Sequence, residues 1–173
     1  MPAPHSPAHG APKMTDSQIV SLEVLAGSLE TGTRLLGLDL GTKTIGLALS
    51  DVSRTIATPL ETIRRTKFMN DMNKILEITG KLDVSAFVLG LPLNLNGTEG
   101  PRAQATRSFA ANLTRQIDLP LVLWDERLST VAAERTLLEA DASRKRRSEV
   151  IDKVAAAFIL QGALDRLANI GAG

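Results

Sequence analysis

Three acidic positions, far apart in the chain, stand where carboxylates could act together. Asp39 lies in the apolar run 34–40, which has the pattern of a central strand covered on both faces. Asp125 and Glu126 follow a second such run, and Asp152 lies beside small alanines in a segment with helical spacing. Charged residues are rare in such segments unless something pairs with them. Taken singly, each acid could instead cap a turn or sit on a solvated helix face.

Acids that converge without a matching lysine raise one another's pKa or recruit a cation. The chain contains no Cys, and ligation by oxygen alone selects a hard ion such as Mg²⁺ or Mn²⁺. Two such ions about 3.5–4 Å apart support in-line displacement at phosphorus, by activating water and stabilising the leaving oxygen. We expect Asp39 to bridge the ions, with Glu126 and Asp152 as further catalytic and metal-binding acids and Asp125 as an additional candidate.

Basic residues near these acids indicate a phosphate-containing partner. Lys43 lies in the turn after Asp39, Arg127 adjoins Glu126, and Arg102 opens a predicted helix whose N-terminus favours phosphate. A run of basic residues before the last predicted helix could hold a phosphate backbone: Arg144, Lys145, Arg146 and Arg147. A solvated loop is the plainer interpretation of this run, but its place beside an acid cluster favours nucleic-acid binding.

Composition limits the class of protein. The chain has 173 residues, 43% hydrophobic and 23% charged, as expected for a single globular domain with a sizeable core. The net charge is +1, so any nucleic-acid signal must come from local clusters. With four Phe, one Trp and no Tyr, a stacking platform for single-stranded bases is not expected. No apolar run approaches the ~20 residues that span a bilayer, and the lack of Cys agrees with a cytoplasmic location.

The elements that position these residues follow the order βββαβαβαα. Strands are expected at 34–40, 44–51, 55–64, 84–91 and 121–124, and helices at 67–80, 101–116, 129–139 and 148–168. Pro59 places the third strand at a sheet edge, because proline lacks the ladder donor. An antiparallel meander that continues into right-handed crossovers gives a mixed five-stranded sheet with helices on both faces. We therefore predict an α/β fold of the ribonuclease H-like type, with the acids at the carboxyl edge of its parallel strands.

The flanking segments are predicted to be simpler. The proline-rich residues 1–14 read as a disordered tail, and residues 15–33 as an N-terminal helix extension. That helix would start at a capping box from Thr15 to Gln18 and end near Gly27. A signal peptide is rejected because Glu23 interrupts the apolar run. The ribonuclease H-like domain would cover 34–168, followed by a C-terminal tail, 169–173.

Four motifs, in this order, resemble the YqgF/RuvX family over residues 34–168. They are GLDLGTKTIG at 37–46, GLPLN with GTEG at 90–100, DERLST at 125–130 and IDKVAA at 151–156. The resemblance implies a bacterial cytoplasmic, metal-dependent nuclease with a ribonuclease H-like fold. It also implies a role in maturing the 5′ end of the 16S ribosomal RNA precursor, with Asp39, Glu126 and Asp152 as the catalytic acids.

The sequence departs from related patterns at three places. The family usually has a basic residue where Thr44 stands, so one phosphate contact is expected to be missing. RuvC-type resolvases carry a second helix acid where this chain has Ala155, and a fourth-strand Glu where it has Leu91 and Pro92. These two departures weaken the interpretation as a Holliday junction resolvase acting on branched DNA more than they weaken nuclease activity in general. The resolvase is kept as an alternative, as is a non-catalytic factor that binds ribosomal RNA or the ribosome.

A sugar-kinase or actin-like ATPase is a third interpretation, since the Asp39–Thr42 segment resembles the first phosphate loop of those enzymes. The chain is too short to hold their second lobe. The sequence leaves open whether the protein is a monomer or a homodimer.

Overall fold

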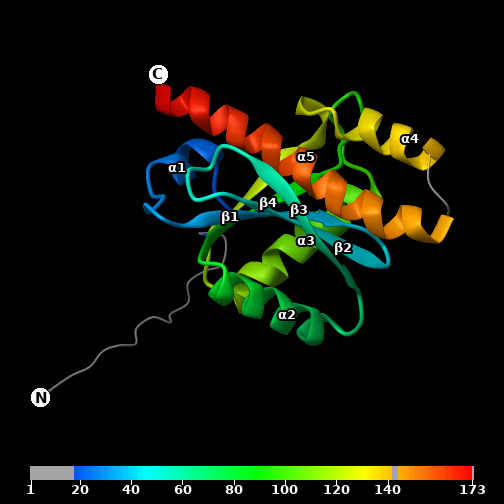
Figure 1. Cartoon of the computed structure of the whole chain (residues 1–173), viewed down its shortest axis with the longest axis horizontal. Coiled ribbons are helices and arrows are strands. Elements are labelled where there is room, and N and C mark those ends of the chain that lie inside the picture. The colour runs from blue at the N-terminus through cyan, green and yellow to red at the C-terminus, as the bar shows by residue number, and fades with distance from the viewer. Residues whose placement is uncertain (1–17, 142–143, 173) are drawn as a thin grey trace, which may run out of the picture.

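The chain folds around one mixed sheet. The computed structural model describes the backbone of residues 18–141 and 144–172, and their side chains except at 141–148 and 172. The predicted tail 1–14 lies outside these ranges. The elements in chain order (Figure 1) are α1 (Leu22–Ala26), β1 (Arg34–Leu40), β2 (Thr44–Ser50), β3 (Ala57–Arg64), α2 (Phe68–Lys81), β4 (Val84–Leu91), α3 (Pro101–Gln116), β5 (Leu121–Asp125), the short 3₁₀ helix η3 (Glu126–Leu128), α4 (Val131–Asp141) and α5 (Arg144–Ala172).

The five strands lie in the order β3-β2-β1-β4-β5. β1 pairs antiparallel with β2, and β2 with β3, whereas β4 is parallel to both β1 and β5. This is the predicted ribonuclease H-like arrangement, with β1 at the centre. β3, which contains Pro59, is an edge strand as expected, because its missing donor is tolerated only there.

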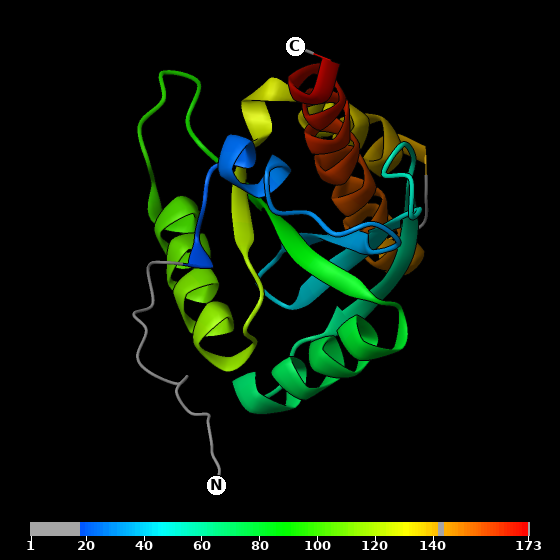
Figure 2. The same ribbon diagram turned by 90° about the vertical axis from the view of Figure 1, so that its left-hand side faces the viewer.

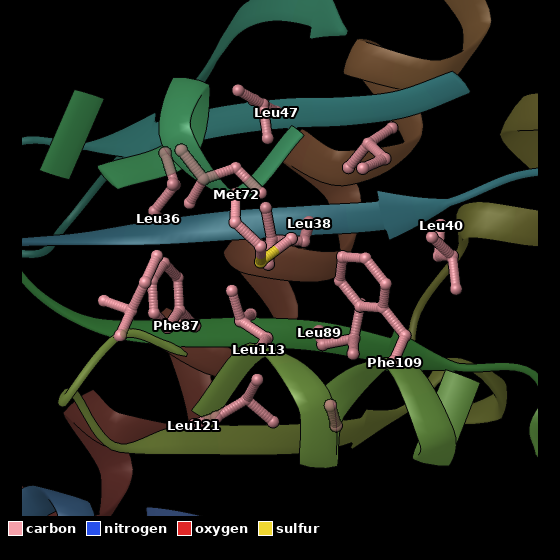
Figure 3. Packing of buried hydrophobic residues seen from close by; sticks show 14 of the residues in the cluster. Leu36, Leu38, Leu40, Leu47, Met72, Phe87, Leu89, Phe109, Leu113 and Leu121 are labelled. Atoms are coloured by element: carbon pink, nitrogen blue, oxygen red, sulfur yellow. The ribbon is translucent and has the colours of Figure 1, made fainter. Parts of the chain in front are cut away.

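Helices cover both faces of the sheet (Figure 2). On one face, α2 and α3 pack against a large apolar cluster that includes Leu38, Met72, Phe109 and Leu113 (Figure 3). On the other, α1 and α5 pack against a second cluster, which includes Leu25 and Ile159. Because side chains alternate along a strand, each buried strand contributes to both clusters, which explains its unbroken apolar sequence.

The helix α5 lies unusually close to the sheet because glycines face it. A Cβ added to Gly46 would stand 2.0 Å from the carbonyl oxygen of Asp152, and one added to Gly37 would stand 2.8 Å from the Cβ of Leu160. The small side chain of Ala156 is fully buried at this contact. The contact fixes the α5 segment around Asp152 against β2.

Several predicted boundaries are wrong at the ends of the chain. Residues 18–21 are not α-helical, and α1 starts at Leu22, where the hydroxyl of Ser21 accepts the Val24 N–H. Residues 15–17, with most of the predicted capping box, lie outside the described residues; the predicted end at Gly27 is as expected. α5 starts at Arg144 and ends at Ala172, so Ser148 is not its cap and most of the predicted tail 169–173 is helical.

The basic run 144–147 was expected to be a loop and instead forms the first turn of α5. Its side chains lie outside the described part. Ala155, Ala156 and Ile159 are buried, whereas Val154 and Phe158 are only half-buried. None of the helices described is long and apolar enough to cross a membrane.

The glycine contact makes a direct prediction. Gly46→Ala should lower the free energy of unfolding by about 1–3 kcal/mol, because the backbone of α5 leaves no room for a methyl group. Gly80→Ala, in the last turn of α2 with nothing within 4 Å, should instead raise it slightly, by up to about 0.5 kcal/mol. Urea denaturation of both variants measures this pair of effects. Equal stability of Gly46→Ala and the wild type would contradict the close contact.

Candidate active site

Asp39 occupies the centre of the candidate site. Leu38 and Leu40 belong to the cluster under α2 and α3, so Asp39, between them, faces α5. The residue is only 3% exposed. On the neighbouring strand β2 its partner is Gly46, which itself touches the backbone of Asp152. The fold therefore brings the α5 segment that carries Asp152 close to Asp39.

Glu126 and Asp125 follow β5 but turn in different directions. A Cβ added to Gly90 would stand 2.6 Å from Oε2 of Glu126, so the Glu126 side chain lies back over β4. Asp125 instead caps η3 by accepting the Arg127 N–H, and forms an ion pair with the Arg127 guanidinium at 2.7 Å. Arg127 also donates to the carbonyl of Leu95 and so contacts the loop 92–100. Asp125, predicted as an additional metal ligand, thus has a structural partner here.

An arginine that the sequence interpretation missed joins two of the acids. Nη2 of Arg135 lies 2.7 Å from Oδ1 of Asp39, and its Nη1 lies 3.3 Å from Oε1 of Glu126. The available signal was helical spacing, because Arg135 follows the fully buried Val131 by four residues and therefore shares its face of α4. The charge of Arg135 offsets part of the negative charge at the site.

Asp152 is held by a different partner. The Thr44 hydroxyl, buried at the start of β2, donates to Oδ2 of Asp152. Burial raises the pKa of the Asp152 carboxyl above its ordinary value; the Thr44 hydrogen bond opposes this, and the charge of Asp39 adds to it. Thr44, which stands where the family usually has a basic residue, therefore positions an acid.

The three acids share one electrostatic environment. Burial raises the pKa of Glu126, the Arg135 charge opposes this rise, and the Asp39 charge adds to it, as it does at Asp152. Even so, the described residues include no group of three or more acidic, histidine or cysteine side chains that is arranged to hold a metal ion. The structure thus brings the predicted acids to one edge of the sheet, with Arg135 bonded to two of them.

Basic side chains border the site on the side of the 41–44 turn. Arg102 donates to the Leu40 carbonyl at 3.3 Å, and its charge lowers the pKa of both Glu126 and Asp152 against the effect of burial. Arg65, which was not predicted, donates to the Gly41 carbonyl at 2.6 Å, and its backbone N–H bonds to the carbonyl of Lys43. We call Lys43, Arg65 and Arg102 the cationic rim.

Comparison with known proteins agrees with this architecture. The mixed sheet with buried acids at its carboxyl edge defines a ribonuclease H-like protein. The family model RuvX, described as Holliday junction resolvase, matches residues 33–166. The chain therefore belongs to the RuvX family, as its sequence motifs predicted.

Curated relatives share most of their length with the chain. A protein of Paramagnetospirillum magneticum is 66% identical over 141 residues, which are 82% of this chain and 91% of that protein. One of Ruegeria sp. is 61% identical over 150 residues, 87% of this chain and 96% of that protein. Both carry the name "Putative pre-16S rRNA nuclease". Among solved structures, T. thermophilus RuvC in complex with a Holliday junction substrate is 13% identical, with a TM-score of 0.49, over 79% of this chain and 96% of that one.

The raised pKa of Asp152 predicts a pH-dependent effect on stability. Because the folded state disfavours the charged carboxylate, Asp152→Asn should raise the free energy of unfolding at pH 7 by up to about 1 kcal/mol, a small gain because solvent screens a half-buried charge. The gain should disappear below pH 3.8, the ordinary pKa of the group, where the wild-type carboxyl is protonated in both states. Urea denaturation across this pH range measures it, with the exposed Asp165→Asn as control. An Asp152→Asn variant less stable than the wild type at neutral pH would contradict the raised pKa of Asp152.

Proposed function

We propose that this protein is a metal-dependent nuclease that cleaves phosphodiester bonds in the ribosomal RNA precursor, at the 5′ end of pre-16S rRNA. The names of the curated relatives support this substrate, and membership of the RuvX family supports a nuclease. The structural observation that carries the proposal is the group of Asp39, Glu126 and Asp152 at one sheet edge, next to a rim of cations. Such a function fits a cytoplasmic location.

The donor chemistry of the site fits a hard divalent cation. Asp39, Glu126 and Asp152 offer only carboxylate oxygens, which Mg²⁺ and Mn²⁺ prefer. Two of them have a pKa raised by burial, so a bound cation would relieve the cost of their charge. We propose that these three residues hold the metal ions, in the two-ion manner expected for this chemistry. When bound, the ions would activate the attacking water and stabilise the leaving oxygen.

The remaining side chains would orient the substrate and the acids. Thr44, through its hydroxyl, keeps the Asp152 carboxylate directed toward the site. The cationic rim offers guanidinium and ammonium groups to the phosphates that flank the scissile bond. Arg102 also favours the ionised form of the acids that must act as ligands. The side chains of the basic run 144–147 are not described, and their proposed contact with the phosphate backbone rests on the sequence.

A resolvase acting on four-way DNA junctions is the second candidate, because the matching family model carries that description. Ala155 is buried against the sheet, so α5 supplies no second acid at that position. Incubating the protein with a pre-16S rRNA fragment and a four-way junction, with and without Mn²⁺, distinguishes the two substrates. Binding of the RNA without cleavage of either would favour a non-catalytic factor. Oligomeric state measured in solution adds to this comparison, because a resolvase must act on two strands.

Asp39→Asn should abolish Mn²⁺-dependent cleavage while it preserves the fold. The amide keeps the size of the side chain and one acceptor oxygen for Arg135, but it removes the charge that would bind the ion. We expect at least about a 10³-fold lower rate in a gel assay on the RNA precursor, a loss of the size expected when metal-ion catalysis fails. Circular dichroism checks the fold, and Asp165→Asn, remote on α5, is the matched control. Cleavage by Asp39→Asn at the wild-type rate would refute the assignment.

Removing a rim cation should weaken RNA binding and its dependence on salt. In an Asp39→Asn background, Lys43→Gln and Arg65→Gln should each reduce the slope of log K against log salt concentration by about 0.7–0.9, because each releases one counterion fewer. Filter binding at several salt concentrations measures the slope. Arg166→Gln, which removes an exposed arginine paired with Glu23, should leave it unchanged. Unchanged slopes in both rim variants would exclude these side chains as phosphate contacts.

A further inference from the structure

Arg135 bonds to the oxygen atoms that a metal ion would need. Its guanidinium pairs with Oδ1 of Asp39 and Oε1 of Glu126, and the three side chains are 22%, 5% and 11% exposed. A carboxylate as buried as that of Asp39 is costly unless it is paired. The guanidinium is therefore the counter-ion of these two acids in the absence of metal.

A divalent cation and the Arg135 guanidinium do not readily pair with the Asp39 and Glu126 carboxylates at the same time. Both are positive, both are directed at the same carboxylates, and their repulsion is strong in a partly buried site. Asp152, the third acid, bonds to Thr44 rather than to Arg135, so it is available without rearrangement. The competition thus concerns Asp39 and Glu126.

We propose that Arg135 competes with the metal ion for Asp39 and Glu126 and leaves them when the ion binds. This inference rests on the proposed function, since it assumes that the site takes a divalent cation. Arg135 is carried by α4, which packs mainly against α5 and η3 rather than against the sheet. Its long side chain reaches the site from the periphery, so it can withdraw without disturbing β1 or the Asp152 contact.

The proposal predicts opposite effects on stability and on metal affinity. Arg135→Met keeps a long side chain but leaves Asp39 and Glu126 without their counter-ion. In EDTA the thermal midpoint of Arg135→Met should fall below that of the wild type. Mn²⁺ should raise this midpoint by more than it raises that of the wild type. Its Mn²⁺ dissociation constant, measured by isothermal titration calorimetry on the full chain, should be about tenfold lower or better, since a competing unit charge has been removed. A merely structural role would lower the midpoint without tightening Mn²⁺ binding.

Two further variants and one measurement on the wild type complete the test. Arg135→Lys keeps the charge but not the forked guanidinium that reaches two carboxylates. Its Mn²⁺ affinity should therefore lie between that of the wild type and that of Arg135→Met. Arg166→Met should behave as the wild type. In the unmodified protein, the Nε–H resonance of Arg135 should move toward that of a free arginine as diamagnetic Mg²⁺ saturates the site. This readout does not depend on whether any variant folds.

The outcomes separate the two proposals. Mn²⁺ binding that Asp39→Asn abolishes but Arg135→Met leaves unchanged or weakens would overturn the competition alone, as would an Arg135 resonance that stays fixed at Mg²⁺ saturation. A wild type that binds no Mn²⁺, together with undiminished cleavage by Asp39→Asn, would overturn the proposed function and the competition with it.

Discussion

The rest of this structure depends on how the charge of Asp39 is compensated. Its carboxylate lies on the central strand and is almost completely buried. Losing one partner of a buried ion pair costs about 3–5 kcal/mol, a large part of the stability of a domain this size. The chain meets this constraint with Arg135, whose guanidinium lies 2.7 Å from the Asp39 carboxylate. The position of α4, which carries Arg135, is therefore coupled to the charge of a residue on β1.

The site consists of two halves that are anchored differently. Asp39, Thr44 and Asp152 come from β1, β2 and α5, which meet at a contact so close that only glycine fits at position 46. Glu126 and Arg135 come from η3 and α4, short elements that follow the last strand. The first half lies in a packed core with little freedom to shift. Any adjustment on binding a ligand is expected in the second half.

The parts of the fold that were predictable are those fixed by the sheet. Apolar runs such as 84–91 indicate strands buried on both faces, because an exposed face would carry polar residues. Pro59 indicates an edge strand, because a central strand would lose a hydrogen bond there. Asp152 was singled out because the small alanines beside it let its helix approach the sheet. Asp39 and Glu126 were singled out because charge at the end of a buried strand is unusual. Their convergence then followed from the shared edge of parallel strands.

Two features escaped prediction for physical reasons. In the sequence, Arg135 resembles any charged residue on a partly exposed helix. Its partner Asp39 is far away in the chain, and its partner Glu126 belongs to the preceding element, η3. The first turn of α5 carries four basic residues, which oppose the helix dipole at an N-terminus, so helix rules favour a loop there. Packing of the rest of α5 on the sheet outweighs that local preference, as tertiary contacts often do.

The acids are easier to explain by function than by stability. Replacing a buried ion pair by apolar groups of similar size is often neutral or stabilising, so a fold selected only for stability has no need of Asp39, Glu126 and Arg135 together. Asp152 adds a third charge, which its own surroundings disfavour. Thr44 and Arg102 reduce that cost without removing it, and both act by favouring the ionised carboxylate. Three acids kept at a cost in stability, beside cations that could hold phosphate, are what the proposed cation-dependent phosphodiesterase would require.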